Sequence, residues 1–485
     1  MQQNTKKEDV HKKNVGRYLI IILVEVLAVG IALLFLGQYK DQNTRKQMLF
    51  HGTLGNLAAQ SLDEMSVAVS TASAAKSAEE LETGEKKSNS KQAEEETEDT
   101  EKERAGESTS TAEDGKQATD TSSSDQEEKL TKEEKKQRKE VEDLLKNMTI
   151  EEKICQMFIV SPEELTNYFN VTVAKANTKR AINQYHVGGV VYFASNIKSE
   201  SQLKKLLKNT QTYATQDGGI PMFLGVDEEG GEVARLANHK NISVQQFSYL
   251  SNVSSTEEAY SIGNTIGTYL NEFGFNLNFA PDADVLTNKK NTVVKNRSFG
   301  SDATTVTDYA KAYTEGLQDE GIYATYKHFP GHGATKEDSH KEFAYIDKTY
   351  EELLENEWVP FLDAIEKKMD MIMVGHICVP KIVGHDTPSS LSKVMVTDIL
   401  REKLGYDGVI ITDAMNMAAI SNNYSIEEST VAAVVAGCDI ILMPADFRKA
   451  YKAILKEVKA GEITEERLDE SVRRILLLKK QRLDW

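Results

Sequence analysis

Apolar and polar residues alternate in blocks between residue 149 and the C-terminus, and these blocks predict strands separated by helices. Short apolar runs predict strands at 157–161, 187–193, 221–227, 276–284, 322–328, 370–376, 407–413 and 439–445. Amphipathic stretches between most of them predict helices at 199–215, 257–273, 303–320, 350–367 and 447–459. Continuous apolar strands joined through helices imply a parallel sheet covered on both faces. The pattern therefore predicts an α/β fold, a (β/α)8 TIM-type barrel.

A doubly wound open sheet is the alternative architecture. No GxGxxG or GxxxxGK(S/T) motif follows any of the predicted strands, so a nucleotide-binding version of that fold would lack its phosphate-binding loop. The folded domain is predicted to span residues 131–485. A helix is expected over 131–147, and Thr149 with Glu152 has the spacing of a capping box at the start of the next helix.

One long apolar run, Tyr18–Leu36, precedes the domain. A helix of this length reaches roughly 28 Å, close to the thickness of a bilayer core. Basic residues lie before it, at Lys6, Lys7, Lys12, Lys13 and Arg17. Under the positive-inside rule they predict a cytoplasmic tail (1–17), a transmembrane signal-anchor helix (18–37) and an extracellular remainder on a single-pass membrane protein.

Other interpretations of that run are a cleaved signal peptide, a lipoprotein anchor and a buried core helix. The residues after it, Gly37 to Lys40, make a poor cleavage site, and no cysteine follows for lipidation. The three cysteines, Cys155, Cys378 and Cys438, are widely spaced and form neither a disulfide framework nor a CxxC zinc motif.

Residues 38–130 are predicted to be a low-complexity acidic linker. No Phe, Tyr, Trp or Pro occurs between His51 and Met157, and Lys76–Leu130 carries 18 acidic and 8 basic residues, a net −10 of the chain's −18. Such a segment buries too little apolar surface to fold alone, and we interpret it as a spacer; a charge-specific interaction tail is the alternative. The acidic balance of the chain argues against nucleic-acid binding.

Five predicted strands end in charged or imidazole side chains. They are Asp227, Asp282 with Asp284, Lys327 with His328, His376 and Asp413. In a barrel the C-terminal ends of the strands meet at one rim, which is where chemistry takes place in this fold. Any one of these residues alone could be a turn or capping residue, but together they predict a shared active site.

The segment 327–340 is the densest in chemistry, with Lys327, three histidines and Asp338. Asp338 and His340 are two residues apart, so the carboxylate can fix the tautomer of the imidazole and favour its protonated form. A histidine of this kind can give a proton to a leaving group and later take one from water. The alternative is a metal-dependent hydrolase with His328, His332, Asp338 and His340 as ligands. For His332 itself, support of the loop is favoured over direct catalysis.

Asp413 ends a buried apolar strand in the segment GVIITDAM. A carboxylate delivered there is suited to attack an anomeric carbon while the leaving group is protonated. Taken alone, Asp413 would be interpreted as the N-cap of a helix starting at Ala414, in preference to a nucleophile.

Four segments together carry a resemblance to a known family. They are KHFPGHG with DSH (327–340), VDEEGG with RL (226–236), RSFG (297–300) and ITDAM (411–415). This combination resembles family 3 glycoside hydrolases, and within them the bacterial β-N-acetylglucosaminidases, over roughly residues 140–485. The resemblance implies Asp413 as nucleophile and His340 as general acid/base held by Asp338. It also implies sugar-hydroxyl contacts from Asp227, Lys327 and His328, and a subsite bordered by Arg235 and Arg297.

The chain departs from the family in one position, Glu232, where a basic residue is common. A second domain with a glutamate acid, found in relatives that cleave glucosides, is not expected after the last helix. We therefore expect a retaining exo-β-N-acetylglucosaminidase acting on terminal β-linked GlcNAc of peptidoglycan fragments. Its partners would be this carbohydrate and, through the N-terminal helix, the membrane; no cofactor or metal is expected.

Three further alternatives remain at this point. A phosphorylase is one, because an imidazole acid/base repels phosphate less than a carboxylate does. A family 3 β-glycosidase specific for another sugar is the second. The third is a non-catalytic wall-binding module, which would be expected to lack Asp413 or His340, and this chain has both.

Overall fold

The computed structural model describes residues 131–336, 338, 342–483 and 485 of the chain. All of them belong to one compact unit, Gly115–Trp485. No helix in this described part combines the length and apolar character needed to cross a bilayer. The predicted segments 1–17, 18–37 and 38–130 lie outside the described residues, so the anchor and the linker stay predictions.

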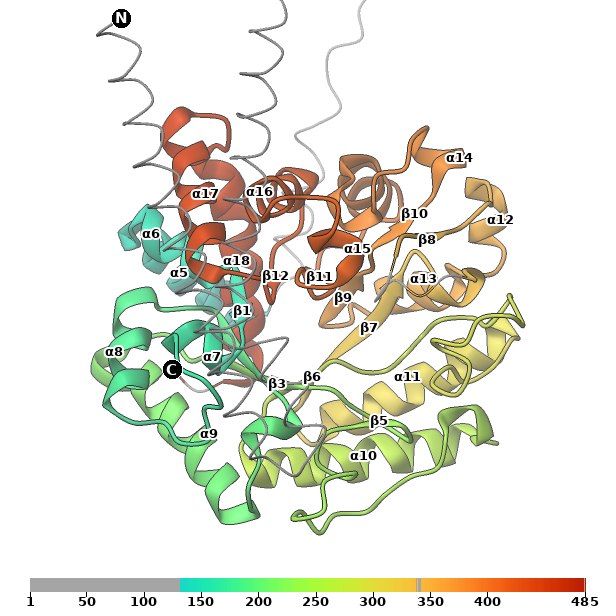
Figure 1. Ribbon diagram of the computed structural model, residues 1–485, viewed down its shortest axis with the longest axis horizontal. Helices are drawn as coiled ribbons and strands as arrows, with labels where there is room; N and C mark the ends of the chain where they lie inside the picture. The colour runs from blue at the N-terminus through green and yellow to red at the C-terminus, as the bar shows by residue number, and fades with distance from the viewer. Residues whose placement is uncertain (1–130, 337, 339–341, 484) are drawn as a thin grey trace, which may run out of the picture. The chain divides into compact units, whose positions relative to one another are not determined.

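Eight parallel strands form the central sheet (Figure 1). They are β1 (Phe158–Val160), β2 (Gly189–Tyr192), β3 (Phe223–Val226), β6 (Leu277–Asn278), β7 (Tyr323–Phe329), β9 (Met371–Val374), β11 (Val409–Thr412) and β12 (Ile441–Leu442). Each lies inside one of the predicted apolar runs or extends it by one residue. In the sheet order β11-β9-β7-β6-β3-β2-β1-β12, every neighbouring pair is parallel.

The two end strands of that order also meet, and this closes the sheet into a barrel. Ile411 of β11 forms a parallel bridge with Ile440, next to β12. The amide of Thr412 donates to the carbonyl of Ile440 at 3.0 Å, and that of Asp439 donates to Ile410 at 2.7 Å. The (β/α)8 prediction is therefore confirmed, and the open doubly wound sheet is excluded.

Helices connect the strands and cover the barrel. In chain order they are α5 (Lys132–Asn147), α6 (Ile150–Gln156), α7 (Pro162–Thr166), α8 (Ala176–Tyr185), α9 (Glu200–Thr215), α10 (Thr256–Phe273), α11 (Ala303–Asp319), α12 (Tyr350–Leu354), α13 (Val359–Glu366), α14 (Pro380–Val383), the π-helix η6 (Val394–Lys403), α15 (Ala418–Ser421), α16 (Ile426–Ala436), α17 (Phe447–Ala460) and α18 (Glu465–Arg482). The capping box of Thr149 and Glu152 is present at α6. The helix predicted over 350–367 is split into α12 and α13.

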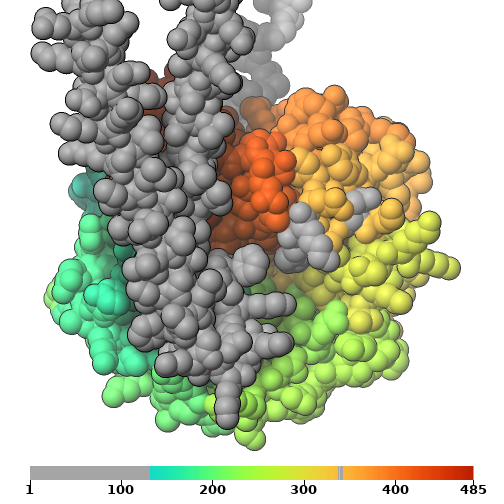
Figure 2. Space-filling model, in the orientation of Figure 1, coloured from blue at the N-terminus to red at the C-terminus, as the bar shows by residue number. Residues whose placement is uncertain are grey.

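Segments that follow one another along the chain also lie side by side. In Figure 1, α10 and α11 run next to each other under β6, and in Figure 2 the orange surface of the segments around β9 and β11 borders the yellow surface that precedes β7.

Large side chains fill the barrel end where the strands begin: the rings of Phe223 and Tyr323 pack edge to face at 5.3 Å, both buried. The three cysteines are free and buried.

Two short parallel strands fasten the loops above the barrel. β8 (Ala344–Tyr345), in the loop after β7, pairs with β10 (Ile377–Cys378), in the loop after β9. A small antiparallel hairpin, β4 (Glu228–Gly230) with β5 (Val233–Ala234), follows β3. The sequence did not predict these four strands, which lie outside the apolar runs assigned to the barrel.

Candidate active site

The residues at the ends of β3, β6 and β7 form one buried network of charges. Lys327, near the end of β7, has its ammonium 2.6 Å from Glu229 and donates to Asp227 at 3.2 Å. Burial alone would lower the pKa of Lys327, but Glu229 and Asp227 outweigh it, so this pKa lies above its ordinary value. Lys327 is therefore a fixed cation at the rim.

Glu229 joins the two main cations of the network. Arg297 donates to it through Nε at 2.8 Å and through Nη2 at 2.7 Å, a bidentate pair. Burial opposes the charge on Glu229, yet Arg297 and Lys327 hold the pKa of this carboxyl well below its usual range. The same contacts raise the pKa of Arg297 against its burial. Glu229 thus sets the orientation of both side chains, a role that the sequence did not reveal.

Asp284, after β6, holds the histidine loop. Its carboxylate lies 2.7 Å from Nδ1 of His328 and accepts the backbone N–H of His332 at 2.5 Å. Burial would raise the pKa of Asp284, but His328 beside it makes the net shift downward. Nδ1 of His328 is occupied by Asp284, and Nε2 of His328 faces the guanidinium of Arg297, 3.5 Å from Nη2.

His332 is placed as a supporting residue. Its ring is buried, Nδ1 lies 2.9 Å from the hydroxyl of Thr335, and its carbonyl accepts from Asn291 at 2.9 Å. Burial, with the neighbouring His328, lowers the pKa of His332 to about 4, so the imidazole is neutral at physiological pH. This favours loop support over proton transfer.

Asp282, Asp284 and His328 place three potential metal-ligand atoms within 4.8 Å of one another. The guanidinium of Arg297 already faces the group: its Nε is 3.4 Å from Asp282, and its Nη2 is 3.5 Å from His328. Burial and the neighbouring Asp284 raise the pKa of Asp282 well above its ordinary value. The guanidinium of Arg297 therefore already places a positive charge beside these carboxyls.

Asp227 and Arg235 form the more open edge of the cluster. Their side chains are 21% and 34% exposed and lie 3.4 Å apart, a weaker pair than those beneath them. Arg235 reaches this position because buried Glu228 accepts the amides of Leu236 and Ala237 at 2.7 and 2.8 Å and so folds the loop back. These two residues are the accessible part of the predicted sugar-binding set.

Asp413 lies at the C-terminal end of β11, half-buried. Its amide donates to the carbonyl of Val374 on β9 at 2.9 Å, and its carboxylate accepts the amide of Ala414 at 2.7 Å. The next helix, α15, begins only at Ala418, with Met417 in the N-cap position. Asp413 is therefore not a helix N-cap, and the structural alternative weighed from sequence is wrong.

His376, two residues after the end of β9, fixes the peptide after Asp413. Its Nε2 lies 3.0 Å from the carbonyl of Ala414, and its Nδ1 lies 2.8 Å from the hydroxyl of Ser390. A carbonyl only accepts, so Nε2 carries the hydrogen of that bond. His376 is buried and positions the backbone that carries the predicted nucleophile.

The predicted acid/base pair lies in the loop between β7 and β8. Asp338 is described and half-buried, whereas His340 lies outside the described residues. The base of the loop is held by Trp358, whose Nε1 donates to the carbonyl of Pro330 at 3.0 Å, and its far end by the β8–β10 pairing. The loop is thus anchored above the same rim, while the Asp338–His340 contact stays a prediction.

A closed barrel with a buried charge network and a carboxylate at the C-terminal ends of its strands has the arrangement of a barrel enzyme whose active site lies at that end. Residues 149–478 match the family described as "Glycosyl hydrolase family 3 N terminal domain". The chain therefore belongs to glycosyl hydrolase family 3, as its motifs indicated.

Several known proteins are similar to the chain. Beta-hexosaminidase A of Pseudoalteromonas piscicida is 32% identical over 336 residues, covering 64% of this chain and 56% of that protein. Beta-hexosaminidase LpqI of Mycobacterium tuberculosis is 32% identical over 314 residues, 63% of this chain and 78% of that protein. A solved family 3 β-N-acetylglucosaminidase from Paenibacillus sp. FPU-7 superimposes with a TM-score of 0.65 at 36% identity, covering 69% of this chain and 63% of that one. The chain thus spans little more than half of the first relative.

Proposed function

We propose that the chain is a retaining exo-β-N-acetylglucosaminidase that releases terminal β-linked GlcNAc. The observation that carries the proposal is the network of Lys327, Arg297 and His328 at the rim that also bears Asp413. The network offers hydrogen-bond donors for sugar hydroxyls, and the half-buried carboxylate of Asp413 lies at the C-terminal end of another strand of the same barrel. The β-hexosaminidase names of the similar proteins support the choice of sugar.

In the proposed mechanism, Asp413 attacks the anomeric carbon while His340 protonates the glycosidic oxygen. The bond from carbon to the leaving oxygen breaks as the ester to Asp413 forms, and His340 then takes a proton from the water that hydrolyses this ester. Asp338 favours the imidazolium that the first step needs. Asp227, Lys327 and His328 hold the hydroxyls of the sugar, and Arg235 and Arg297 border it.

Replacing Asp413 with asparagine tests this mechanism. Because an amide neither attacks nor stabilises the developing cation as a carboxylate does, we expect kcat/KM for an aryl N-acetyl-β-glucosaminide to fall by about four orders of magnitude. Asp407→Asn is the matched control, since Asp407 precedes the other end of β11 and its side chain is 87% exposed. Near-normal turnover by the Asp413 variant would refute the assignment. GlcNAc 1-phosphate as product in added inorganic phosphate would indicate the phosphorylase instead.

We further propose that residues 18–37 anchor the enzyme in the cell membrane, with 38–130 as a spacer, and that its substrates are peptidoglycan fragments. The apolar run with basic residues before it supports the anchor, and an extracellular site next to the cell wall supports the substrate. The full chain should sediment with membranes, and a chain lacking residues 18–37 should not. Recovery of both forms in the soluble fraction would disprove the anchor.

A further inference from the structure

Helix α17 carries four lysines in one line. Lys449, Lys452, Lys456 and Lys459 follow one another at intervals of three, four and three residues, which places them on one face of the helix. All four are exposed, while the apolar face of α17 is buried. The line is about 15 Å long, and neighbouring charges in it lie within a Debye length of one another, so they act together on a charged surface. We call these four residues the lysine stripe.

The lysine stripe differs from an ordinary solvated helix face, in which charges of both signs alternate. Helices α5 and α18 mix acidic and basic residues along their length. Helix α17 contains five basic residues and one acidic residue, Glu457, which pairs with Lys456 at 2.8 Å. Glu151 of α6 lies 3.9 Å from Lys459. Within the described part of the chain the other two lysines of the stripe form no ion pair, so their charges are not compensated.

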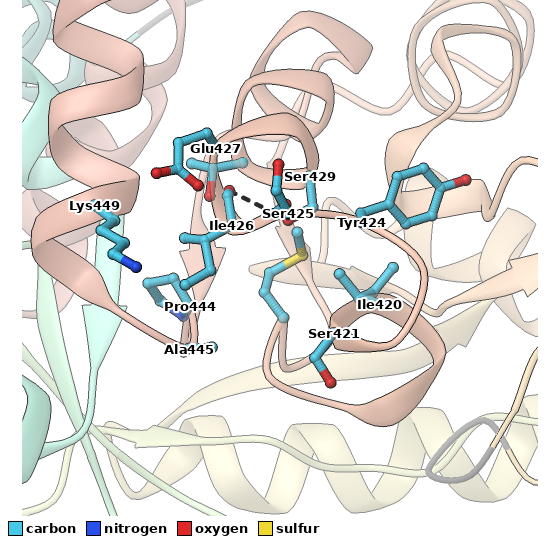
Figure 3. Close-up of a pocket in the computed structure, with 12 residues that line it drawn as sticks. Ile420, Ser421, Tyr424, Ser425, Ile426, Glu427, Ser429, Pro444, Ala445 and Lys449 are labelled. Atoms are coloured by element: carbon cyan, nitrogen blue, oxygen red, sulfur yellow. Dashed lines mark hydrogen bonds between the residues drawn. The ribbon is translucent and has the colours of Figure 1, made fainter. Parts of the chain in front are cut away.

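The surface beside the lysine stripe is neutral over most of its length. Helix α16, which packs against α17, has no charged residue from Ser429 to Ala436, and Val435 is 49% exposed. At the start of the stripe, Lys449 borders a cavity of about 340 Å³ (Figure 3). Glu427 is the one acid that lines this cavity. The stripe is therefore a positive surface with a neutral margin.

We propose that the lysine stripe binds the anionic phospholipid headgroups of the bilayer in which the chain is anchored. The proposal rests on the anchor proposed above for residues 18–37 and is independent of the glycosidase chemistry. The lysine ammonium is a compact, strongly hydrated charge on a flexible stem, which suits headgroup phosphates at a wet interface. Each lysine at an anionic surface strengthens the association about fivefold.

Connection to the anchor makes this weak contact effective. Residues 38–130 separate the predicted anchor from the domain, and a flexible chain of about 90 residues has an r.m.s. end-to-end distance of roughly 50–60 Å. A domain kept this close meets the bilayer at a high effective concentration. Residues 76–130 carry a net charge of −10 and are repelled by anionic lipids, so the attraction must come from the domain.

Energy transfer from the domain to the bilayer tests the contact in the full chain. Because the three native cysteines are buried, Ala460→Cys, at the exposed end of α17, gives one position for a donor dye. The labelled chain is reconstituted into vesicles of phosphatidylcholine alone, or of phosphatidylcholine and phosphatidylglycerol in equal parts. Both kinds of vesicle contain an acceptor-labelled lipid.

Two double variants separate the lysine stripe from charge in general. Lys449→Gln with Lys452→Gln removes the two uncompensated charges. Lys205→Gln with Lys208→Gln on α9 is the matched control, because these lysines are also exposed and have the same three-residue spacing. All forms should have the same Tm, which shows that the fold is kept.

Energy transfer should be higher in the vesicles with phosphatidylglycerol, and about 0.5 M NaCl should remove the difference between the two lipids. For the Lys449 and Lys452 variant, the ratio of docked to free domain in the anionic vesicles should fall about tenfold or more. For the Lys205 and Lys208 variant this ratio should stay near its native value.

Equal energy transfer with the two lipids, or an equal fall in the α9 variant, would overturn the inference and leave the anchor intact. If the lipids made no difference but the native chain bound inorganic polyphosphate and the stripe variant did not, the partner would be a soluble polyanion and the inference would be wrong. A chain that sediments with neither kind of vesicle would refute the anchor and this inference together. None of these outcomes depends on hydrolysis, so the proposed glycosidase activity is tested separately.

Discussion

Replacing Glu229 with glutamine removes the central negative charge of the active-site network while keeping the shape of the side chain. The carboxylate accepts two hydrogen bonds from Arg297 and lies 2.6 Å from the ammonium of Lys327. Both cations are at most 9% exposed. With glutamine between them, two buried positive charges face each other across a neutral group.

The expected cost follows from that burial. Removing one partner of a buried ion pair destabilises a fold by about 3–5 kcal/mol. Asp227, 3.2 Å from Lys327, and Asp282, 3.4 Å from Arg297, still offer some compensation. We therefore expect a loss near the lower limit, about 3 kcal/mol. If Lys327 and Arg297 bind the sugar as proposed, moving them by about 1 Å should also lower kcat/KM about a hundredfold.

The pH dependence gives a second signature of the same charge. Because the pKa of Glu229 is lowered in the folded protein, its charge stabilises the fold above the pKa of the unfolded chain, which is near 4.5. That stabilisation is lost as the pH falls toward the folded value. The gap in stability between the native chain and Glu229→Gln should be constant from about pH 6 to 8 and shrink below about pH 4.5.

Urea denaturation across this pH range and kcat/KM on an aryl N-acetyl-β-glucosaminide measure the two effects. Glu232→Gln is the matched control, three residues along the same loop and exposed. If Glu229→Gln unfolds within about 1 kcal/mol of the native chain and keeps half of its kcat/KM, the network does not depend on this charge.

Two further predictions concern the opposite end of the barrel and the metal alternative. Lys479 is fully buried, 2.9 Å from Gln156 and 5.0 Å from the ring of Phe223, and burial lowers its pKa to about 7. The unfolded chain, with a lysine pKa near 10.5, binds more protons between these values, so native stability rises with pH across that window. Lys479→Met should raise Tm by about 2 °C or more near pH 7, with the gain vanishing near pH 10; a lower Tm at pH 7 would contradict the argument. EDTA should leave activity unchanged, since Arg297 supplies the positive charge beside Asp282 and Asp284; loss of activity that added metal restores would favour a metal-dependent hydrolase.

The fold could be read from the sequence because each barrel strand is a short apolar run between polar segments. Each apolar run can be recognised from its own residues, without knowing which segments pack against it. The one helix that was predicted wrongly, 350–367, is interrupted at residues 355–358, where Nε1 of buried Trp358 donates to the carbonyl of Pro330. This hydrogen bond joins residues 28 apart in the chain, so the pattern of apolar residues within 350–367 does not indicate it.

The active site was only partly predictable for the same reason. Asp227, Arg297, Lys327 and His328 could be named from motifs, and the structure brings these residues together. Glu229 could not, because three acidic residues in a row before two glycines are typical of a solvated loop, and only tertiary burial makes one of them the partner of two cations. Asp413 was ambiguous until the position of α15 was known.

The manner in which α5 joins the barrel has a mechanical consequence. Val141 and Leu145 of α5 are buried, and Glu142 forms an ion pair with Arg473 of α18, the last helix of the chain. Tension applied to the chain at residue 131 is therefore transmitted to a pair of packed terminal helices. Because α18 also contacts β11, and the hydroxyl of Tyr323 on β7 donates to the carbonyl of Leu478 in α18 at 2.8 Å, a load at residue 131 reaches the strands that carry Asp413 and Lys327 through this one helix.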